Sequence, residues 1–354
     1  MMKYIVKYCR ELIFLVFSVC SDHFLPFLGL HTLMNFLPAF LYGCTAPQAM
    51  PPPETETVTK VSMEAVSGDM EEMDIFVFKD DRLQRLDCYQ KVTAPASWNN
   101  EIVSGYGERI IAVFANSGKD VMDWAGISSL SYLSRQTVSL EEESLKHPFM
   151  SGTVKIAAGK ESRYNTLDIR PLLSIVELRS ICCDFRGRPY AGEPLEDVRV
   201  YLTNVNAECR VLEESDILPS RILNAGRLRE EDISSLKAPD LIVREIGQSI
   251  GTKPVYPGIQ LICYPNNSAT ESPGTPFTRL VIEGKVQGET FYWPLNINKD
   301  DGGYGIGRNE KYIFDITITR KGTKDPDLPV STEDIDIILN IGKWDEKEDC
   351  EVLF

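Results

Sequence analysis

Short runs of β-branched and aromatic residues, separated by turn-forming residues, recur through most of the chain. In several of these runs apolar side chains alternate with others, which is the pattern of half-buried strands. The predicted strands are residues 57–66, 73–83, 108–118, 148–159, 196–205, 258–265, 278–286, 289–297, 311–322 and 333–344. Strands at this spacing predict an all-β fold of antiparallel sandwiches rather than a doubly wound sheet.

One apolar run fits two kinds of element. Residues 170–185 could form a strand or a helix, and the β-compatible Ile175, Val176 and Ile181 favour the strand. The polar residues 206–255 are predicted to be a long irregular excursion. Minor helical connections are predicted at residues 120–134, 139–146 and 228–240.

The length of 354 residues allows two domains. A boundary between residues 165 and 166 would give an N-terminal β-sandwich over 58–165 and a C-terminal one over 166–354. The formal net charge of −15 argues against nucleic-acid binding, which needs clustered Lys and Arg to displace counterions.

The first 43 residues differ from the rest. Lys3, Lys7 and Arg10 precede a long apolar run, an arrangement typical of an export signal. A transmembrane anchor is the alternative, because the segment is long for a signal peptide. Against it, Asp22 and Pro26 divide the run into pieces shorter than a bilayer requires.

The apolar run ends at Leu41-Tyr42-Gly43-Cys44, which matches the pattern cleaved by bacterial lipoprotein signal peptidase. The Cys44 thiol would accept a diacylglycerol, and its new amine a further acyl chain such as palmitate. Two signals of this kind give stable membrane anchoring. Cys20 is the competing position, but the preceding valine fits the peptidase poorly. Residues 44–57 would then form a Pro-rich spacer.

The exported part offers little catalytic chemistry. His147 is its only histidine and has no nucleophile motif nearby. The cysteines match no zinc spacing, and the sequence does not fix whether they pair. The glycine-rich residues 302–309 lack the spacing of a nucleotide-binding loop and predict a hairpin connection. We therefore expect no enzyme activity, no cofactor and no metal.

Several segments resemble, in their order along the chain, the Bacteroidales fimbrillin family, the subunits and anchors of a lipoprotein-derived pilus. After Cys44 come "ETVTKVSMEAV", "MDIFVFKDDRLQRL" and "GYGERIIAVFANSG", and later "YPGIQLICYP" and "ETFYWPLNI". The segment "IGRNEKYIFDITITRKGTKDPDLP" carries Arg308, Asn309, Tyr312 and Gly322 at the family's motif positions.

The resemblance implies two transthyretin-like sandwich domains that assemble by strand complementation. In this process the first strand is removed and a strand from a neighbouring subunit fills the groove. The incoming strand pairs with the unpaired backbone N–H and C=O groups and covers the exposed apolar side chains. The removable strand would contain Glu54, Val58, Val61, Met63 and Val66. The candidate donor strand lies in the tail and contains Ile335, Ile337, Leu339 and Ile341.

The chain departs from the family in one respect. Polymerising members carry an arginine in a cleavage loop after the first strand, but no arginine occurs between Cys44 and Arg82. This favours an anchor or accessory subunit that keeps its lipid over a polymerising stalk subunit.

Three classes of function follow. The favoured one is a structural pilus subunit at the cell outer membrane, lipid-anchored at least as a precursor, with other fimbrial subunits as partners. A surface lipoprotein that binds glycans is the alternative, with Trp124 and residues 292–294 as the suggestive aromatic positions. An enzyme acting through His147 or a carboxylate pair is the third.

Overall fold

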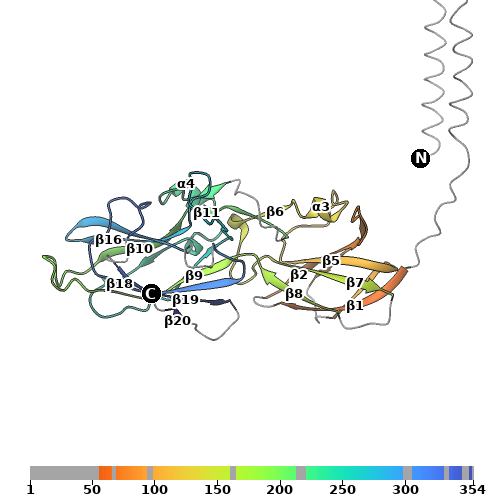
Figure 1. Ribbon diagram of the computed structural model, residues 1–354, viewed down its shortest axis with the longest axis horizontal. Helices are drawn as coiled ribbons and strands as arrows, with labels where there is room; N and C mark the ends of the chain where they lie inside the picture. The colour runs from red at the N-terminus through yellow and green to blue at the C-terminus, as the bar shows by residue number, and fades with distance from the viewer. Residues whose placement is uncertain are drawn as a thin grey trace, which may run out of the picture. The chain divides into compact units, whose positions relative to one another are not determined.

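The computed structural model of the chain describes residues 56–65, 69–93, 99–159, 165–212, 221–297, 305–330, 335–344 and 351–352. Residues 55–354 form one compact unit (Figure 1). The predictions for the signal segment, Cys44, the spacer, Glu54 and Val66 fall outside the described residues.

The N-terminal strands form one seven-stranded sheet in the order β3-β2-β5-β7-β8-β1-β4. Its strands are β1 (Glu56–Ala65), β2 (Glu72–Lys79), β3 (Leu86–Thr93), β4 (Asn99–Gly105), β5 (Gly107–Ala115), β7 (Met150–Ala158) and β8 (Asn165–Pro171). β7 and β8 pair at only two positions, Met150↔Pro171 and Ser151↔Arg170. The sheet turns back on itself there, so that its two parts enclose a common core.

The later strands form two larger sheets and two small ones. The four-stranded sheet runs β14 (Val243–Ile246), β10 (Glu196–Thr203), β16 (Arg279–Val286), β17 (Glu289–Asn296). The five-stranded sheet runs β15 (Ile259–Cys263), β9 (Ser174–Cys183), β18 (Glu310–Ile318), β19 (Ile335–Lys343), β20 (Glu351–Val352). The small pairs are β11 (Val205–Asn206) with β13 (Ile222–Leu223), and β6 (Thr137–Ser139) with β12 (Glu208–Arg210). Figure 1 shows β9, β18 and β19 side by side.

The predicted all-β sandwich class is confirmed, and most pairs are antiparallel. Two pairs are parallel: β1 with β8, and β9 with β18. The change of sheet comes after Pro171, between β8 and β9. The division into domains at residues 165 and 166 stays a prediction.

Two apolar clusters make up the core of the described residues. The smaller one, hereafter the inner core, lies inside the seven-stranded sheet. It consists of Val61, Met73, Ile75, Val77, Ile102, Ile111, Val113, Ala115, Met150, Ile156, Ala158, Leu167 and Ile169. The larger cluster extends from the other face of β2 and β5 into the later sheets. β2 and β5 are therefore buried on both faces, with alternate side chains in the two clusters.

The helices are shorter than predicted. The described elements are α3 (Leu130–Leu133), α4 (Glu230–Ser234) and the 3-10 turns η1 (Leu140–Glu142) and η2 (Pro239–Leu241). Over 120–134 the helix prediction is wrong for most of its length, because successive i→i+3 turns bring Trp124 and Ile127 down onto the sheet. Over 139–146 it fails because Glu143 turns inward to a buried hydrogen bond with Tyr264. None of the described helices is long and apolar enough to cross a membrane.

Several of the described strands were not predicted, among them β3, β4, β6 and most of β8. Every position of β3 but the last is half-buried, so its sequence shows no contrast between two faces. β4 is polar except for Ile102 and Val103. The excursion over 206–255 is also less irregular than predicted, since it holds the short strands β12, β13 and β14.

Candidate functional site

The predicted removable strand corresponds to β1, which is an interior strand of its sheet. Residues 56–62 of β1 pair antiparallel with β4, from Glu56↔Gly105 to Ser62↔Asn99. Residues 61–65 pair in parallel with β8, from Val61↔Asn165 to Ala65↔Ile169. Both edges of β1 therefore carry ladder hydrogen bonds that would be lost together if the strand left.

Val61 lies in the inner core with no exposed surface. Its neighbours there include Ile102 on β4 and Leu167 and Ile169 on β8. Burying one valine side chain contributes about 1.5–3 kcal/mol, and the area it covers would open to water without β1. Met63 lies opposite the buried Leu167, whereas Val58 lies opposite Val103, which is 46% exposed on the outer face. A vacated site would thus be an apolar trench between two unpaired strand edges.

β4 has a second attachment besides β1. The carboxylate of Asp87, just inside β3, accepts hydrogen bonds from the Gly105 N–H at 2.7 Å and from Arg109 Nε at 2.9 Å. The thiol of Cys88 donates to the carbonyl oxygen of Val103. These contacts hold β4 to β3 independently of β1.

The candidate donor strand corresponds to β19 and is part of the chain's own five-stranded sheet. Ile335 and Leu339 are buried, and Ile337 and Ile341 pack at the edge of the large cluster. The alternation of residue types is imperfect, because the apolar Ile338 is 39% exposed and the polar Asn340 is buried. The structure does not bring β1 and β19 together, because they belong to different sheets. The removable and donor roles of these strands stay predictions.

The motif positions singled out in the sequence lie at close backbone approaches. Arg308 donates to main-chain oxygens at the meeting point of β7 and β8. Asn309 is buried and has φ 57°, in the left-handed region that asparagine tolerates. Tyr312 donates its hydroxyl proton to Glu310 and accepts from the Gly307 N–H. A Cβ on Gly322 would lie 2.1 Å from the carbonyl oxygen of Tyr292.

The described residues hold no constellation for catalysis that the sequence suggested. His147 contacts Glu71 through Nε2 at 3.2 Å, and its Nδ1 is buried without a partner. Burial raises the pKa of Cys183 and of Cys263 to about 12, so neither is a thiolate nucleophile at neutral pH. No group of three or more His, Cys, Asp or Glu residues in the described ranges is arranged to hold a metal ion.

Of the aromatic residues proposed for glycan stacking, Trp124 and Trp293 are in the core and Tyr292 is half-buried. Trp124 is 3% exposed and packs edge-on to Phe76, and Lys119 lies 4.5 Å from the centre of its ring. Trp293 has no exposed surface and donates its indole N–H to the carbonyl oxygen of Arg320. Neither indole face is open to a sugar.

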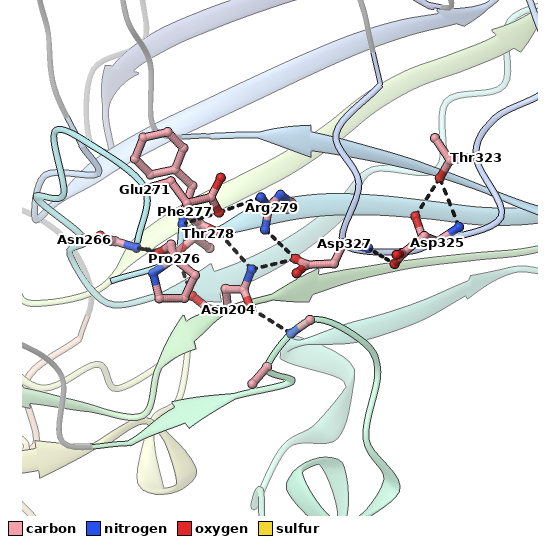
Figure 2. Close-up of polar contacts among 12 residues, drawn as sticks. Asn204, Asn266, Glu271, Pro276, Phe277, Thr278, Arg279, Thr323, Asp325 and Asp327 are labelled. Carbon is pink, nitrogen blue, oxygen red and sulfur yellow. Dashed lines mark hydrogen bonds and ion pairs between the residues drawn. The ribbon is translucent and has the colours of Figure 1, made fainter. Parts of the chain in front are cut away.

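A polar cluster that sequence analysis missed surrounds Arg279 at the end of β16 (Figure 2). The guanidinium is 3% exposed and lies 2.5 Å from both Glu271 and Asp327. Asp327 also accepts a hydrogen bond of 3.2 Å from the Asn204 side chain. The cluster ties two connections to the ends of β10 and β16, the interior strands of the four-stranded sheet, and we interpret it as structural.

Comparison with solved structures gives one consistent result. The chain is similar to a candidate cell adhesion protein from Bacteroides eggerthii, with TM-score 0.61, 14% identity, and coverage of 84% of this chain and 98% of that chain. The fimbrilin fimA from Porphyromonas gingivalis gives TM-score 0.60 and 14% identity over 82% of this chain and 98% of that chain. The chain has the fimbrillin fold.

The tip fimbrial protein Mfa3 from Porphyromonas gingivalis has the same fold, with TM-score 0.54 and 12% identity over 82% of this chain and 100% of that chain. No protein-family model and no curated protein sequence matches the chain. The fimbrillin fold is therefore visible in the structure at identities where sequence comparison finds nothing.

Proposed function

We propose that this protein is a structural subunit of a cell-surface fimbrium, which supports adhesion and assembles by strand complementation. The single observation that carries the proposal is the position of β1, which is the first strand of the fold and fills an interior place between β4 and β8. The fimbrillin fold supports it, since solved structures of this fold are fimbrial and candidate adhesion proteins.

In a polymerising subunit the strand to be replaced would be β1, and the donor would be the tail that contains β19. An incoming strand would restore the ladder bonds to β4 and β8 and cover the inner core with its own apolar side chains. The partners are accordingly other fimbrial subunits: a subunit that loses β1 gives a tail segment and receives one, and an anchor that keeps β1 only gives one.

Cys44 is the proposed attachment to the outer membrane. Acyl chains on its sulfur and amine would anchor the protein, and the Pro-rich spacer would hold the folded part away from the bilayer. The lipobox in the sequence supports this, and the protein would be surface-exposed.

An anchor or accessory role is favoured over a stalk role. No arginine lies between Cys44 and Arg82. Lys60 is inside β1, where it pairs with Glu101 of β4. A protease specific for basic residues thus finds no loop site after the first strand, so the subunit would keep both β1 and its lipid.

The glycan-binding alternative has no observation in its favour, because Trp124 and Trp293 are buried. A non-enzymatic role fits the fold and the positions of His147 and the buried cysteines.

The experiment is strand replacement in the full chain. A site for a sequence-specific protease is placed at Ser67–Gly68, between β1 and β2, and the purified protein is cut there. We expect the cut protein to exchange its first strand for a fluorescent peptide of residues 54–66 after brief treatment with denaturant. The same site at Arg186–Gly187, in the turn after β9, should allow no exchange when cut. A cut protein that never takes up the peptide would contradict the proposal.

A further inference from the structure

The guanidinium of Arg308 joins β7 to β8 where these strands meet. Its Nη2 donates to the carbonyl oxygen of Arg170 at 2.6 Å, and to the carbonyl oxygen and Oγ of Ser151 at 3.1 Å. Its Nε donates to the carbonyl oxygen of Pro171 at 3.2 Å. The acceptors lie on two strands, so one side chain fixes the spacing between them.

β8 depends on this contact more than its neighbours do. On one side β8 pairs with β1, and on the other it pairs with β7 only through Arg170 and Pro171. Beyond that point the strands are in close approach at Gly152, where a Cβ would lie 2.3 Å from the carbonyl oxygen of Asp168. Once β1 has left, β8 is kept beside β7 by these two residue pairs, by packing in the inner core, by the hydrogen bond of 3.2 Å from the Leu172 N–H to the Phe149 carbonyl oxygen, and by the Arg308 hydrogen bonds.

The backbone at Arg308 is itself held in place. The Asn309 N–H donates to the carbonyl oxygen of Leu173, just after β8, at 3.1 Å. The Asn309 carbonyl oxygen accepts from the N–H of Trp344, the first residue after β19, at 3.2 Å. The same turn therefore contacts the end of β8 and the base of the tail, which pre-organises the guanidinium.

Arg308 also lines an open polar groove of about 750 Å³, together with Thr166, Asp168, Glu310 and Lys343. Replacing its side chain would remove hydrogen bonds without opening the apolar core.

We infer that Arg308 is a positioning residue for strand complementation, which keeps β8 in register as the wall of the groove while β1 is absent. The inference rests on the strand complementation in the proposed function, and it concerns the subunit after β1 has been removed. Without Arg308 the β8 edge would lose its fixed distance from β7, and an incoming strand would have to re-order it on binding.

The test uses the full chain with the protease site at Ser67–Gly68, cut and stripped of its first strand, and the fluorescent peptide of residues 54–66. We expect Arg308→Met to weaken peptide affinity by about tenfold or more, the scale of losing hydrogen bonds from a charged donor. Arg308→Lys keeps the charge but lacks the planar guanidinium, so its peptide affinity should lie between those of the wild type and Arg308→Met.

Arg179→Met is the matched control. Arg179 on β9 makes a bidentate ion pair with Asp315 on β18, in the five-stranded sheet and away from β1. Its loss should lower the melting temperature of the uncut protein but leave peptide affinity unchanged.

The outcomes separate the two claims. Wild-type affinity in Arg308→Met would overturn the inference while leaving strand replacement intact. Failure of the wild-type protein to bind the peptide would overturn the proposed function, and the inference with it. If Arg308→Met does not fold, the comparison is made with Arg308→Lys, and wild-type affinity in that variant overturns the inference.

Discussion

The hydroxyl of Tyr264 donates a hydrogen bond of 2.8 Å to the carboxylate of Glu143, although the two residues are 121 positions apart. Tyr264 has no exposed surface and Glu143 is 6% exposed. The second carboxylate oxygen accepts from the Phe149 N–H at 3.1 Å. The connection between β6 and β7 is thereby fixed to the end of β15.

This pair predicts a pH dependence of stability. Burial raises the pKa of Glu143 from its ordinary value of 4.5 to about 7. Between these values the folded protein holds a proton that the unfolded chain releases. The free energy of unfolding should therefore fall as the pH rises from about 4.5 to about 7, by at most about 3 kcal/mol. Urea denaturation across this range measures the slope.

Glu143→Gln should flatten that slope, because an amide cannot titrate. Glu142→Gln is the control, since Glu142 is 62% exposed and should leave the slope as it is. Equal slopes in wild type and Glu143→Gln would refute the prediction.

Gly322→Ala should destabilise the protein. The new Cβ would lie 2.1 Å from the Tyr292 carbonyl oxygen and 2.9 Å from Trp293 Cε2, so backbone must move. We expect a loss of about 1–3 kcal/mol in thermal or urea unfolding. Gly251→Ala meets nothing within 4 Å and should be close to neutral. Similar losses for both would show that the close approach is not the cause.

Asp327→Asn should weaken the Arg279 cluster. The buried guanidinium would keep Glu271 but lose a charged partner, at a cost of about 1–3 kcal/mol. Glu289→Gln breaks an exposed ion pair with Lys324 and should cost less than about 1 kcal/mol. Urea denaturation of both variants measures the two losses in the free energy of unfolding. Equal losses would contradict the structural role of the cluster.

The five described cysteines should all carry reduced thiol groups. Cys88, Cys182, Cys183, Cys209 and Cys263 form no disulfide with one another. Alkylation in denaturant without reductant should modify each of them, as peptide mapping by mass spectrometry would show. In the native protein Cys263 should react most slowly, because it has no exposed surface. Finding any two of the five cross-linked would contradict the structure.

The sequence predicted strands where apolar residues alternate with polar ones or form a continuous run between polar residues. Buried and half-buried positions alternate along β18, and β2 and β5 are continuous apolar runs buried at nearly every position. β3 escaped prediction because its half-buried positions carry polar residues such as Lys91, which bonds to the buried Asp74 of β2. Such a contact depends on the neighbouring strand and leaves no periodic trace.

The candidate site was only partly readable. Alternation marked β1 as a strand but did not show that it pairs with β8 in parallel, which depends on residues about a hundred positions away. Arg308 was marked by a motif, yet its acceptors are main-chain oxygens between Ser151 and Pro171, which no side-chain pattern encodes.

The most direct test of the account is intact mass with N-terminal mapping of the protein purified from its native envelope. We predict a lipid-modified N-terminus at Cys44 with residues 54–66 still attached, as expected of an anchored fimbrial subunit. A start beyond Val66 without lipid would replace the anchor role by a polymerising one. An unprocessed start at Met1 without lipid would contradict the account.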